Sequence, residues 1–510
     1  MSNLESNKRI VKNTAFLYIR MLVNLLIGLY TSRAILDVLG IEDYGIYNVV
    51  AGFVSMASVF TNSTASAARR FITVELGRGD KDNLKKTYST LLVIIGIISI
   101  LILLLGELFG SFFLDDFLVI PESRLESAHI VYHCSLIIFI VNFLTVPNNA
   151  IITAHERMNF FAVISIGQSL AKLAIVLLLY VAAGDKLVIY AVCLVIIDIL
   201  VRLIYGLYCT HNFQESRFVR SFDHEIFRRI FSYSIWASVG SGSAILKEQG
   251  INVLINLFFG VTMNAARGVS IQVQNIVNLF STNIGTAISP QIMKSFAKGQ
   301  KQRAVNLTII QGKVQGILII LLSMPLILDT HYLLNLWLKV VPDYAVIFTQ
   351  WALILVMART IQNTHTPIFL ANGNIKFLEI VAGGIMLLNL PLSYLFLSIG
   401  YPAVITMIIG TIIEIICTFI IYFYLHYLIS FPVVRFFREV FFPILLVGFF
   451  SFGVIYKIIS FFSEESLSRF MMILFSSFAL VGSLSYYIIL NKRERQYALA
   501  LLHNIAKRNR

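Results

Sequence analysis

LGRGDKDNL, residues 76–84, is followed 220 residues later by a segment of similar pattern, FAKGQKQRA, residues 296–304. Both segments place a lysine two residues after a glycine, and both lie between apolar runs. Four pairs of residues match in the same order at separations of 216 or 220: Gly40 with Gly260, Gly79 with Gly299, Pro147 with Pro367, and Asp198 with Glu414. A fixed period of this kind indicates an internal duplication. The sequence therefore predicts two similar halves.

The composition is that of a membrane protein. The chain has 510 residues, of which 58% are hydrophobic and 13% charged, whereas a soluble domain has about 25% charged residues. The apolar runs are about 20 residues long, which suffices for a helix to cross a hydrocarbon layer roughly 30 Å thick. We therefore expect an all-α, polytopic membrane protein.

The expected architecture is fourteen transmembrane helices. Two six-helix lobes are expected at residues 1–215 and 216–430, followed at 431–510 by two additional helices and a cytoplasmic tail. Each lobe would start and end on the same side of the membrane, as in transporters whose two parallel repeats rock about a shared cavity. The expected spans are 12–36, 44–66, 88–114, 128–150, 160–183, 187–208, 230–259, 263–289, 305–328, 344–366, 377–399, 402–426, 437–460 and 467–490.

Charge divides the loops between these spans into two groups. One group, which includes both terminal segments, holds most of the loop Lys and Arg residues, while the other is short and mainly acidic. The positive-inside rule then predicts that both termini are cytoplasmic. The net charge of +13 therefore indicates topology, and no nucleic-acid partner is expected. Because the first apolar run has no small-residue cleavage site, we expect it to remain as the first span.

Several segments resemble the multidrug/oligosaccharidyl-lipid/polysaccharide exporter superfamily, and within it the Wzx-type polysaccharide flippases. They are NTAFLYIRMLVNLLIGLYTSRAILDVLGIEDYGIYN (13–48), LGRGD (76–80), AHERMNFF (154–161) and ANGNIKF (371–377). The resemblance implies a V-shaped, MATE-like helical bundle in the bacterial cytoplasmic membrane. It also implies that the cargo is an undecaprenyl-diphosphate-linked oligosaccharide, moved to the outer leaflet for synthesis of a surface polysaccharide such as O-antigen or capsule.

Charged residues within the expected spans are the candidate site, because a diphosphate bearing sugars needs cations and hydrogen-bond donors to leave water. The candidate cations for a substrate-binding cavity are Lys247, Lys172, Arg20, Arg267, Lys313 and Arg359. The candidates for proton or ion coupling are Glu248, Asp198 and Glu414. This cationic bias favours an anionic cargo, whereas an exporter of organic cations would be expected to show the opposite bias.

Each candidate also has a structural interpretation. Arg20, Lys313 and Arg359 lie close enough to the cytoplasmic ends of their spans to extend towards headgroups, and Arg267 can act as an interface anchor. Asp198 is four residues from Arg202 on one helix face, a spacing that favours a structural ion pair. Glu414 can be neutral, paired across helices, or a proton site.

The stretch SGSAILKEQGIN, residues 241–252, places Lys247 and Glu248 deep in an expected span. Lys172 is also deep, and we expect both lysines to face the cavity, since a lysine facing lipid would tend to lose its proton. Glycines and serines around Lys247 allow the helix to bend or unwind. Amide side chains along the same two spans suit either sugar hydroxyls or hydrogen bonds between helices.

The expected function is transport. A lipid II flippase or a multidrug exporter on the same fold differs only in cargo, and a membrane-embedded polysaccharide polymerase or ligase is disfavoured because the outer loops are short. No catalytic residue, cofactor or metal site is expected. The expected partners are the lipid-linked oligosaccharide, membrane lipids and other polysaccharide assembly proteins.

Overall fold

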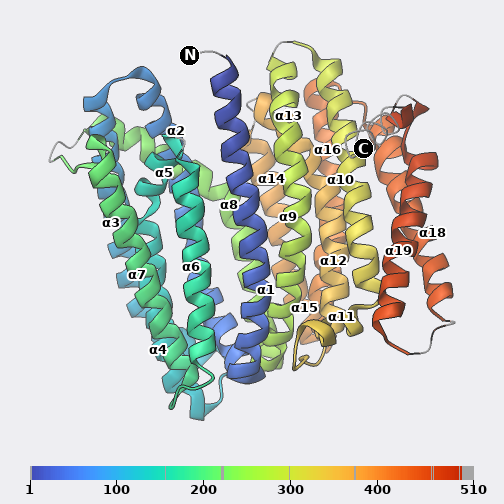
Figure 1. Ribbon diagram of the computed structural model, residues 1–510, viewed down its shortest axis with the longest axis horizontal. Helices are drawn as coiled ribbons and strands as arrows, with labels where there is room; N and C mark the ends of the chain where they lie inside the picture. Colours follow the sequence, from blue (N-terminus) through green and yellow to red (C-terminus); the bar gives the residue numbers. More distant parts are fainter. Residues whose placement is uncertain are drawn as a thin grey trace. The chain divides into compact units, whose positions relative to one another are not determined.

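A computed structural model describes residues 3–155, 157–219, 223–297, 299–372, 375–460, 462, 464–492 and 494–496. The regular elements in this part of the chain are all helices, joined by short non-helical connections, and it contains no strand. In Figure 1 the helices are coloured by their order in the chain, from blue to red. The first eight are α1 Asn3–Ser55, α2 Ser58–Arg78, α3 Lys81–Phe112, α4 Leu125–Leu144, α5 Val146–Ala154, α6 Met158–Leu178, α7 Lys186–Asn212 and α8 His224–Phe259.

The remaining α-helices follow α8 with short connections. They are α9 Val261–Ala297, α10 Lys301–Leu328, α11 Thr330–Trp337, α12 Ala345–Gln362, α13 Thr366–Asn372, α14 Ile375–Leu387, α15 Asn389–Ser398, α16 Ile405–Ile429, α17 Val433–Phe436, α18 Phe442–Ile459 and α19 Leu467–Leu484. Short 3₁₀ or π-helical turns are η1 Phe113–Phe117, η2 Glu122–Arg124, η3 Gln214–Ser216, η4 Asn363–His365, η5 Phe437–Phe441 and η6 Ser485–Ile489.

The all-helical membrane fold expected from the sequence is confirmed, but the number of spans is not. Eleven helices are long and apolar enough to cross a membrane among the residues described. The three other expected spans are 44–66, which covers the end of α1 and the start of α2, 230–259 on α8, and 263–289 on α9. These segments are more polar than the eleven. With 36 residues, α8 measures roughly 54 Å at about 1.5 Å per residue, so its length is sufficient. The count of fourteen stays a prediction.

The backbone breaks at glycines that recur at the predicted period. Gly40 kinks α1 with φ 78° and ψ 175°, and Gly260 separates α8 from α9 with φ 76° and ψ −172°. Gly79 and Gly299 both have φ 75°, and Gly184 and Gly400 have φ 98° and 97°. Only glycine adopts such positive φ values without a steric penalty. The three pairs are 220, 220 and 216 residues apart, which agrees with the predicted duplication.

Two compact units emerge from the packing. The first comprises Met1–Ala265 with the short segment Trp337–Pro342, and the second comprises Ala266–Leu336 with Asp343–Arg510. These groupings differ from the sequence division at residues 215 and 430, because α8 packs on α1, α2 and α3 while α18 and α19 pack on α10. The lobe boundaries derived from the repeat therefore remain a prediction.

Within each unit, long helices lie side by side (Figure 1). In the first unit α1 packs on α6, α4 on α7, and α2 on α8. In the second unit α12 packs on both α10 and α16. Several helices start at an aspartate whose carboxylate accepts backbone N–H groups, as Asp80 does for α3, Asp185 for α7 and Asp223 for α8; such caps satisfy donors left open in the first turn.

Candidate functional site

Lys247 lies within α8 and is only 4% exposed. The helix begins where the Asp223 carboxylate accepts the backbone N–H groups of Glu225 and Ile226. It then continues as regular helix through the glycines and serines around Lys247. The sequence indicated that this segment bends or unwinds easily, but in the structure it is intact. Glu248, the next residue, is partly exposed.

The segment after Lys247 packs closely on the second part of α1. A Cβ atom added at Gly52 would lie 2.7 Å from Gln249 Oε1 and 2.8 Å from Asn252 Nδ2. One added at Gly45 would lie 2.0 Å from the Val261 carbonyl oxygen. The approach at Gly45 requires glycine because the close atom belongs to the backbone, whereas at Gly52 the close atoms are the ends of flexible side chains. The backbone around Lys247 is therefore held by its packing within the first unit.

The amides of this region bond to neighbouring segments of the protein. Asn264 Nδ2 donates to the Asn252 side-chain oxygen at 2.7 Å, and Asn252 Nδ2 donates to the Asn48 carbonyl at 3.1 Å. Asn256 accepts the backbone N–H of Val119 at 2.8 Å through its side-chain oxygen. Of the two interpretations that the sequence allowed for these amides, the contacts favour hydrogen bonds that hold helices together.

Asp198 on α7 is buried and lies in a polar cluster with α6. It accepts a hydrogen bond from Gln168 Nε2 at 2.6 Å. Lys172, which is partly exposed, lies one turn beyond Gln168 on α6 and attracts the Asp198 carboxylate. The structure thus brings together a predicted substrate-binding cation and a predicted coupling acid.

Arg202 does not pair with Asp198, in contrast to the ion pair that the spacing favoured. Its guanidinium donates to the carbonyl of Leu144. Leu144 is the last residue of α4, where carbonyl groups lack partners within the helix. The partner of Arg202 is therefore a carbonyl group at the end of α4 instead of the expected Asp198 carboxylate.

Arg20 on α1 stacks on an aromatic ring of α6. Its guanidinium carbon lies 4.7 Å from the centre of the Phe161 ring. A cation over an aromatic face is attracted by the ring quadrupole. This contact joins the most extensively packed pair of helices in the first unit, α1 and α6.

In the second unit, Glu414 on α16 is paired across helices. Its carboxylate lies 3.2 Å from Arg359 Nε of α12, and its side chain is fully buried while that of Arg359 is 23% exposed. Of the three possibilities left open by the sequence for Glu414, the structure shows the cross-helix pair.

Lys313 on α10 is buried between two carboxylates. Its Nζ lies 3.1 Å from Glu494 and 3.3 Å from Glu439. These contacts connect α10 with η5 and with the segment after α19, and they correspond to the structural anchoring that was the alternative for Lys313. Arg267, in the first turns of α9, is 2% exposed.

An acidic and basic network in the first unit was not foreseen. Arg124 donates to Asp43 at 2.6 Å and to Asp185 at 2.8 Å, and Ser127 donates to Asp185 at 2.6 Å. Burial acts to raise the pKa of Asp185, but the hydrogen bonds from Arg124 and Ser127 outweigh it and hold that pKa below its usual value. Arg124, Asp43 and Asp185 are far apart in sequence. The sequence showed that they are charged loop residues, but it gave no sign that they pair.

A second unforeseen cluster involves the segment Trp337–Pro342. Trp337 Nε1 donates to the carbonyl of Leu29 at 2.8 Å. Lys339 Nζ and the Tyr180 hydroxyl each donate to Asp37 at 2.6 Å. A segment from the later part of the chain is thereby fixed to α1 and to the end of α6.

Comparison with known proteins gives a family and a fold. Residues 10–295, more than half of the chain, match the family model described as polysaccharide biosynthesis protein. The chain is 21% identical over 302 residues to the uncharacterized membrane protein EpsK of Bacillus subtilis strain 168. That match spans 59% of this chain and 59% of EpsK.

Solved structures with the same fold include a lipid II flippase and MATE transporters. The lipid II flippase MurJ in its inward closed conformation has a TM-score of 0.68 at 14% identity, covering 93% of this chain and 98% of MurJ. The eukaryotic MATE transporter AtDTX14 has a TM-score of 0.59 at 15% identity, covering 81% of this chain and 95% of that one. An inward-facing MATE transporter of the MOP superfamily scores 0.58 at 13% identity, covering 79% and 93%.

Proposed function

Because the family model covers more than half of its length, the chain belongs to the polysaccharide biosynthesis protein family, and on that premise we propose that it flips an undecaprenyl-diphosphate-linked oligosaccharide across the bacterial cytoplasmic membrane. The cargo would serve a surface polysaccharide such as O-antigen or capsule. Both termini would lie in the cytoplasm. Transport would proceed by alternating access of two repeat lobes around a cationic cavity.

One observation carries this proposal: Lys247 is buried in a long helix of a multi-pass membrane protein. A lysine at the centre of a membrane helix costs about 2.5–3.5 kcal/mol on insertion scales, so residues of this kind indicate a functional site by default. Lysine also binds phosphate as a point charge. Binding of a diphosphate cargo would explain why the protein keeps a lysine at this unfavourable position.

The candidate cations are proposed for two roles. Lys247, Lys172, Arg20 and Arg267 stay the proposed contacts of the cargo diphosphate, as expected from their positions in the sequence. Arg359 and Lys313 form ion pairs with carboxylates, which supports a role in holding helices together.

Asp198 is the favoured residue for coupling to an ion gradient. It lies beside Lys172, so its protonation would release that cation for the cargo. Glu248 and Glu414 are the other candidates, and the ion pair of Glu414 makes a structural role the simpler assignment for it.

Two alternatives differ in cargo alone. MurJ, whose fold this chain shares, is a lipid II flippase, and the MATE proteins are transporters, one of them for multidrug resistance. The buried cations favour an anionic cargo over organic cations. A polymerase or ligase is disfavoured by the short outer loops.

The cellular test compares surface glycan in a deletion strain complemented with wild type, Lys247→Ala, Lys172→Ala or Arg217→Ala. Arg217 is an exposed loop residue and serves as the control. We expect both lysine variants, at normal protein level, to lose surface glycan and to accumulate its lipid-linked precursor. Wild-type export by both lysine variants would contradict the cationic-cavity mechanism.

A further inference from the structure

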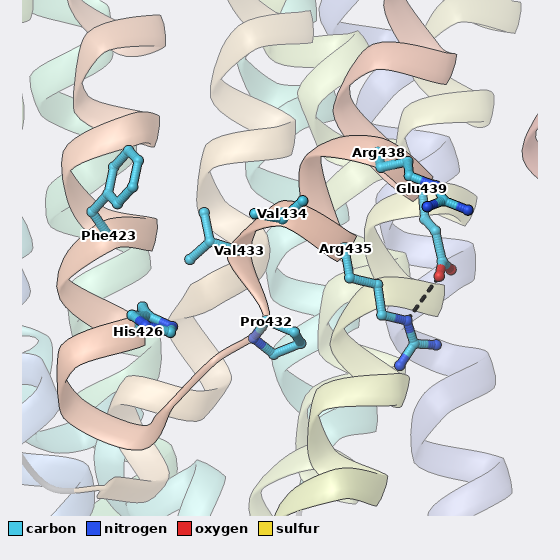
Figure 2. A pocket seen from close by; sticks show the side chains of 8 residues that line it. All are labelled: Phe423, His426, Pro432, Val433, Val434, Arg435, Arg438 and Glu439. Atoms are coloured by element: carbon cyan, nitrogen blue, oxygen red, sulfur yellow. Dashed lines mark hydrogen bonds and ion pairs between the residues drawn. The ribbon is translucent and has the colours of Figure 1, made fainter.

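A cavity of about 590 Å³ lies in the second unit, between the end of α16 and the start of α17. Figure 2 shows that Phe423 and His426 come from α16, while the other labelled side chains come from the segment that follows it. The cavity lies between the ends of two candidate spans, Ile405–Ile429 and Val433–Ile459. It therefore lies at a membrane boundary.

One wall of this cavity is apolar and exposed. Phe423 is 62% exposed and Val434 is 81% exposed. Tyr427, one turn after Phe423 on α16, is 86% exposed. Tyrosine at the end of a span lies at the level of the headgroups, and exposed Phe and Val side chains beside it face the acyl chains. The cavity is therefore accessible from the bilayer.

The other wall carries two arginines (Figure 2). Arg435 donates to Glu439 at 2.8 Å and to Asn306 at 2.9 Å, and its side chain is 40% exposed. Arg438 is exposed, and it forms no ion pair with the residues that the structure describes. Its guanidinium is the group available to an anionic ligand. His426 Nδ1 donates to the carbonyl of Phe431 at 2.8 Å, which fixes the imidazole in the wall.

The carboxylate in this wall does not exclude an anion. Glu439 is shared by Arg435 at 2.8 Å and Lys313 at 3.3 Å. Lys313 also pairs with Glu494. Three cations, counting Arg438, therefore face two carboxylates, and the site keeps a positive charge next to its apolar wall.

We propose that this cavity binds the headgroup of an anionic glycerophospholipid of the surrounding bilayer. The phosphate contacts Arg438 and Arg435, whose planar guanidinium groups match phosphate oxygens. The first methylenes of the acyl chains lie on Phe423 and Val434. Basic pockets between membrane helices bind anionic headgroups in this way. The bound lipid would stabilise the connection between α16 and the two C-terminal helices.

The test uses the purified full-length protein in mixed micelles of equal amounts of phosphatidylglycerol and phosphatidylcholine, with retained lipid counted by native mass spectrometry. Wild type is expected to retain phosphatidylglycerol about fivefold over phosphatidylcholine. Arg438→Gln should lose this preference, and Arg217→Gln, an exposed arginine outside the cavity, should keep it. Equal retention of the two lipids by wild type, or an unchanged preference in Arg438→Gln, would overturn the proposal.

A further variant and a competing lipid test the apolar wall and the identity of the ligand. Val434→Glu places a carboxylate at an exposed position and should abolish the preference without removing an arginine. Undecaprenyl diphosphate, added at a concentration equal to that of phosphatidylglycerol, should leave the bound phospholipid in place. If it displaced the phospholipid from wild type, the cavity would be a site for the polyprenyl carrier and the assignment to bilayer phospholipid would be wrong.

Discussion

Asp198 and Glu414 occupy matching positions in the predicted repeat, and each lies beside a cation from a neighbouring helix. Lys172 attracts Asp198, and Arg359 lies 3.2 Å from Glu414. The sequence identified the acids and the cations but could not pair them, because helix periodicity relates only residues three or four apart. The ion pair that this spacing favoured, Asp198 with Arg202, is replaced by contacts to Gln168 and to the Leu144 carbonyl.

Glu414→Gln tests the cross-helix pair in the second unit. It leaves the Arg359 guanidinium without its buried carboxylate, and we expect a loss of about 2–3 kcal/mol in unfolding free energy. Thermal unfolding in detergent measures this loss. The double variant Glu414→Gln/Arg359→Gln should be more stable than the sum of the two single losses predicts. Simple additivity would show that the two side chains do not interact.

Asp185→Asn tests the network around Arg124. The folded pKa of Asp185 is held below its unfolded value, so its contribution to stability is complete above the unfolded pKa, about 3.9, and declines as pH falls through the folded pKa. Thermal unfolding between pH 6 and 3 should show the wild type losing stability at the acidic end. Asp185→Asn should be less stable at pH 6 and less sensitive to acid. Parallel pH profiles for the two proteins would exclude this contribution.

At the scale of elements, most expected spans fall on observed helices, including the more polar α8 and α9 at 230–259 and 263–289, and one expected span is divided by a break. The expected span at 44–66 is in fact the end of α1, a break at Met56 and Ala57, and the start of α2. The glycine breaks at Gly40 and Gly260 coincide with matched positions of the repeat. By contrast, close approaches such as that of Gly45 to Val261 depend on the packing of helices and leave no local pattern.

Gly45→Ala tests the packing of α1 on the junction of α8 and α9. The added Cβ would lie 2.0 Å from a backbone oxygen, and overpacking of this kind costs about 1–3 kcal/mol. Gly28→Ala is the matched control, because Gly28 lies in the same helix with nothing within 4 Å of the added atom. We expect thermal stability to fall for Gly45→Ala and to be unchanged or slightly higher for Gly28→Ala. Equal behaviour of the two variants would contradict the close approach.

At the scale of the whole molecule, the packing units and the sequence repeat divide the chain differently. The segment Trp337–Pro342 packs in the first unit, where Lys339 binds Asp37. The last two helices are fixed to α10 in the second unit, through Lys313 and through the ion pair of Asp329 with Arg469 at 2.9 Å. Neither connection could be predicted, since the partners of each pair lie more than a hundred residues apart.

The central proposal for the whole molecule is that it moves an anionic lipid-linked glycan between leaflets. Purified protein in proteoliposomes can be supplied with a fluorescent undecaprenyl-diphosphate-linked oligosaccharide, and the outer-leaflet fluorophore quenched by an impermeant reductant. Wild type should flip this lipid far faster than protein-free vesicles. Lys247→Ala should slow flipping about tenfold or more, as expected from the loss of a charged hydrogen bond, while Lys247→Arg should retain most of the rate. Flipping by Lys247→Ala at the wild-type rate would contradict the role of Lys247 in binding the diphosphate.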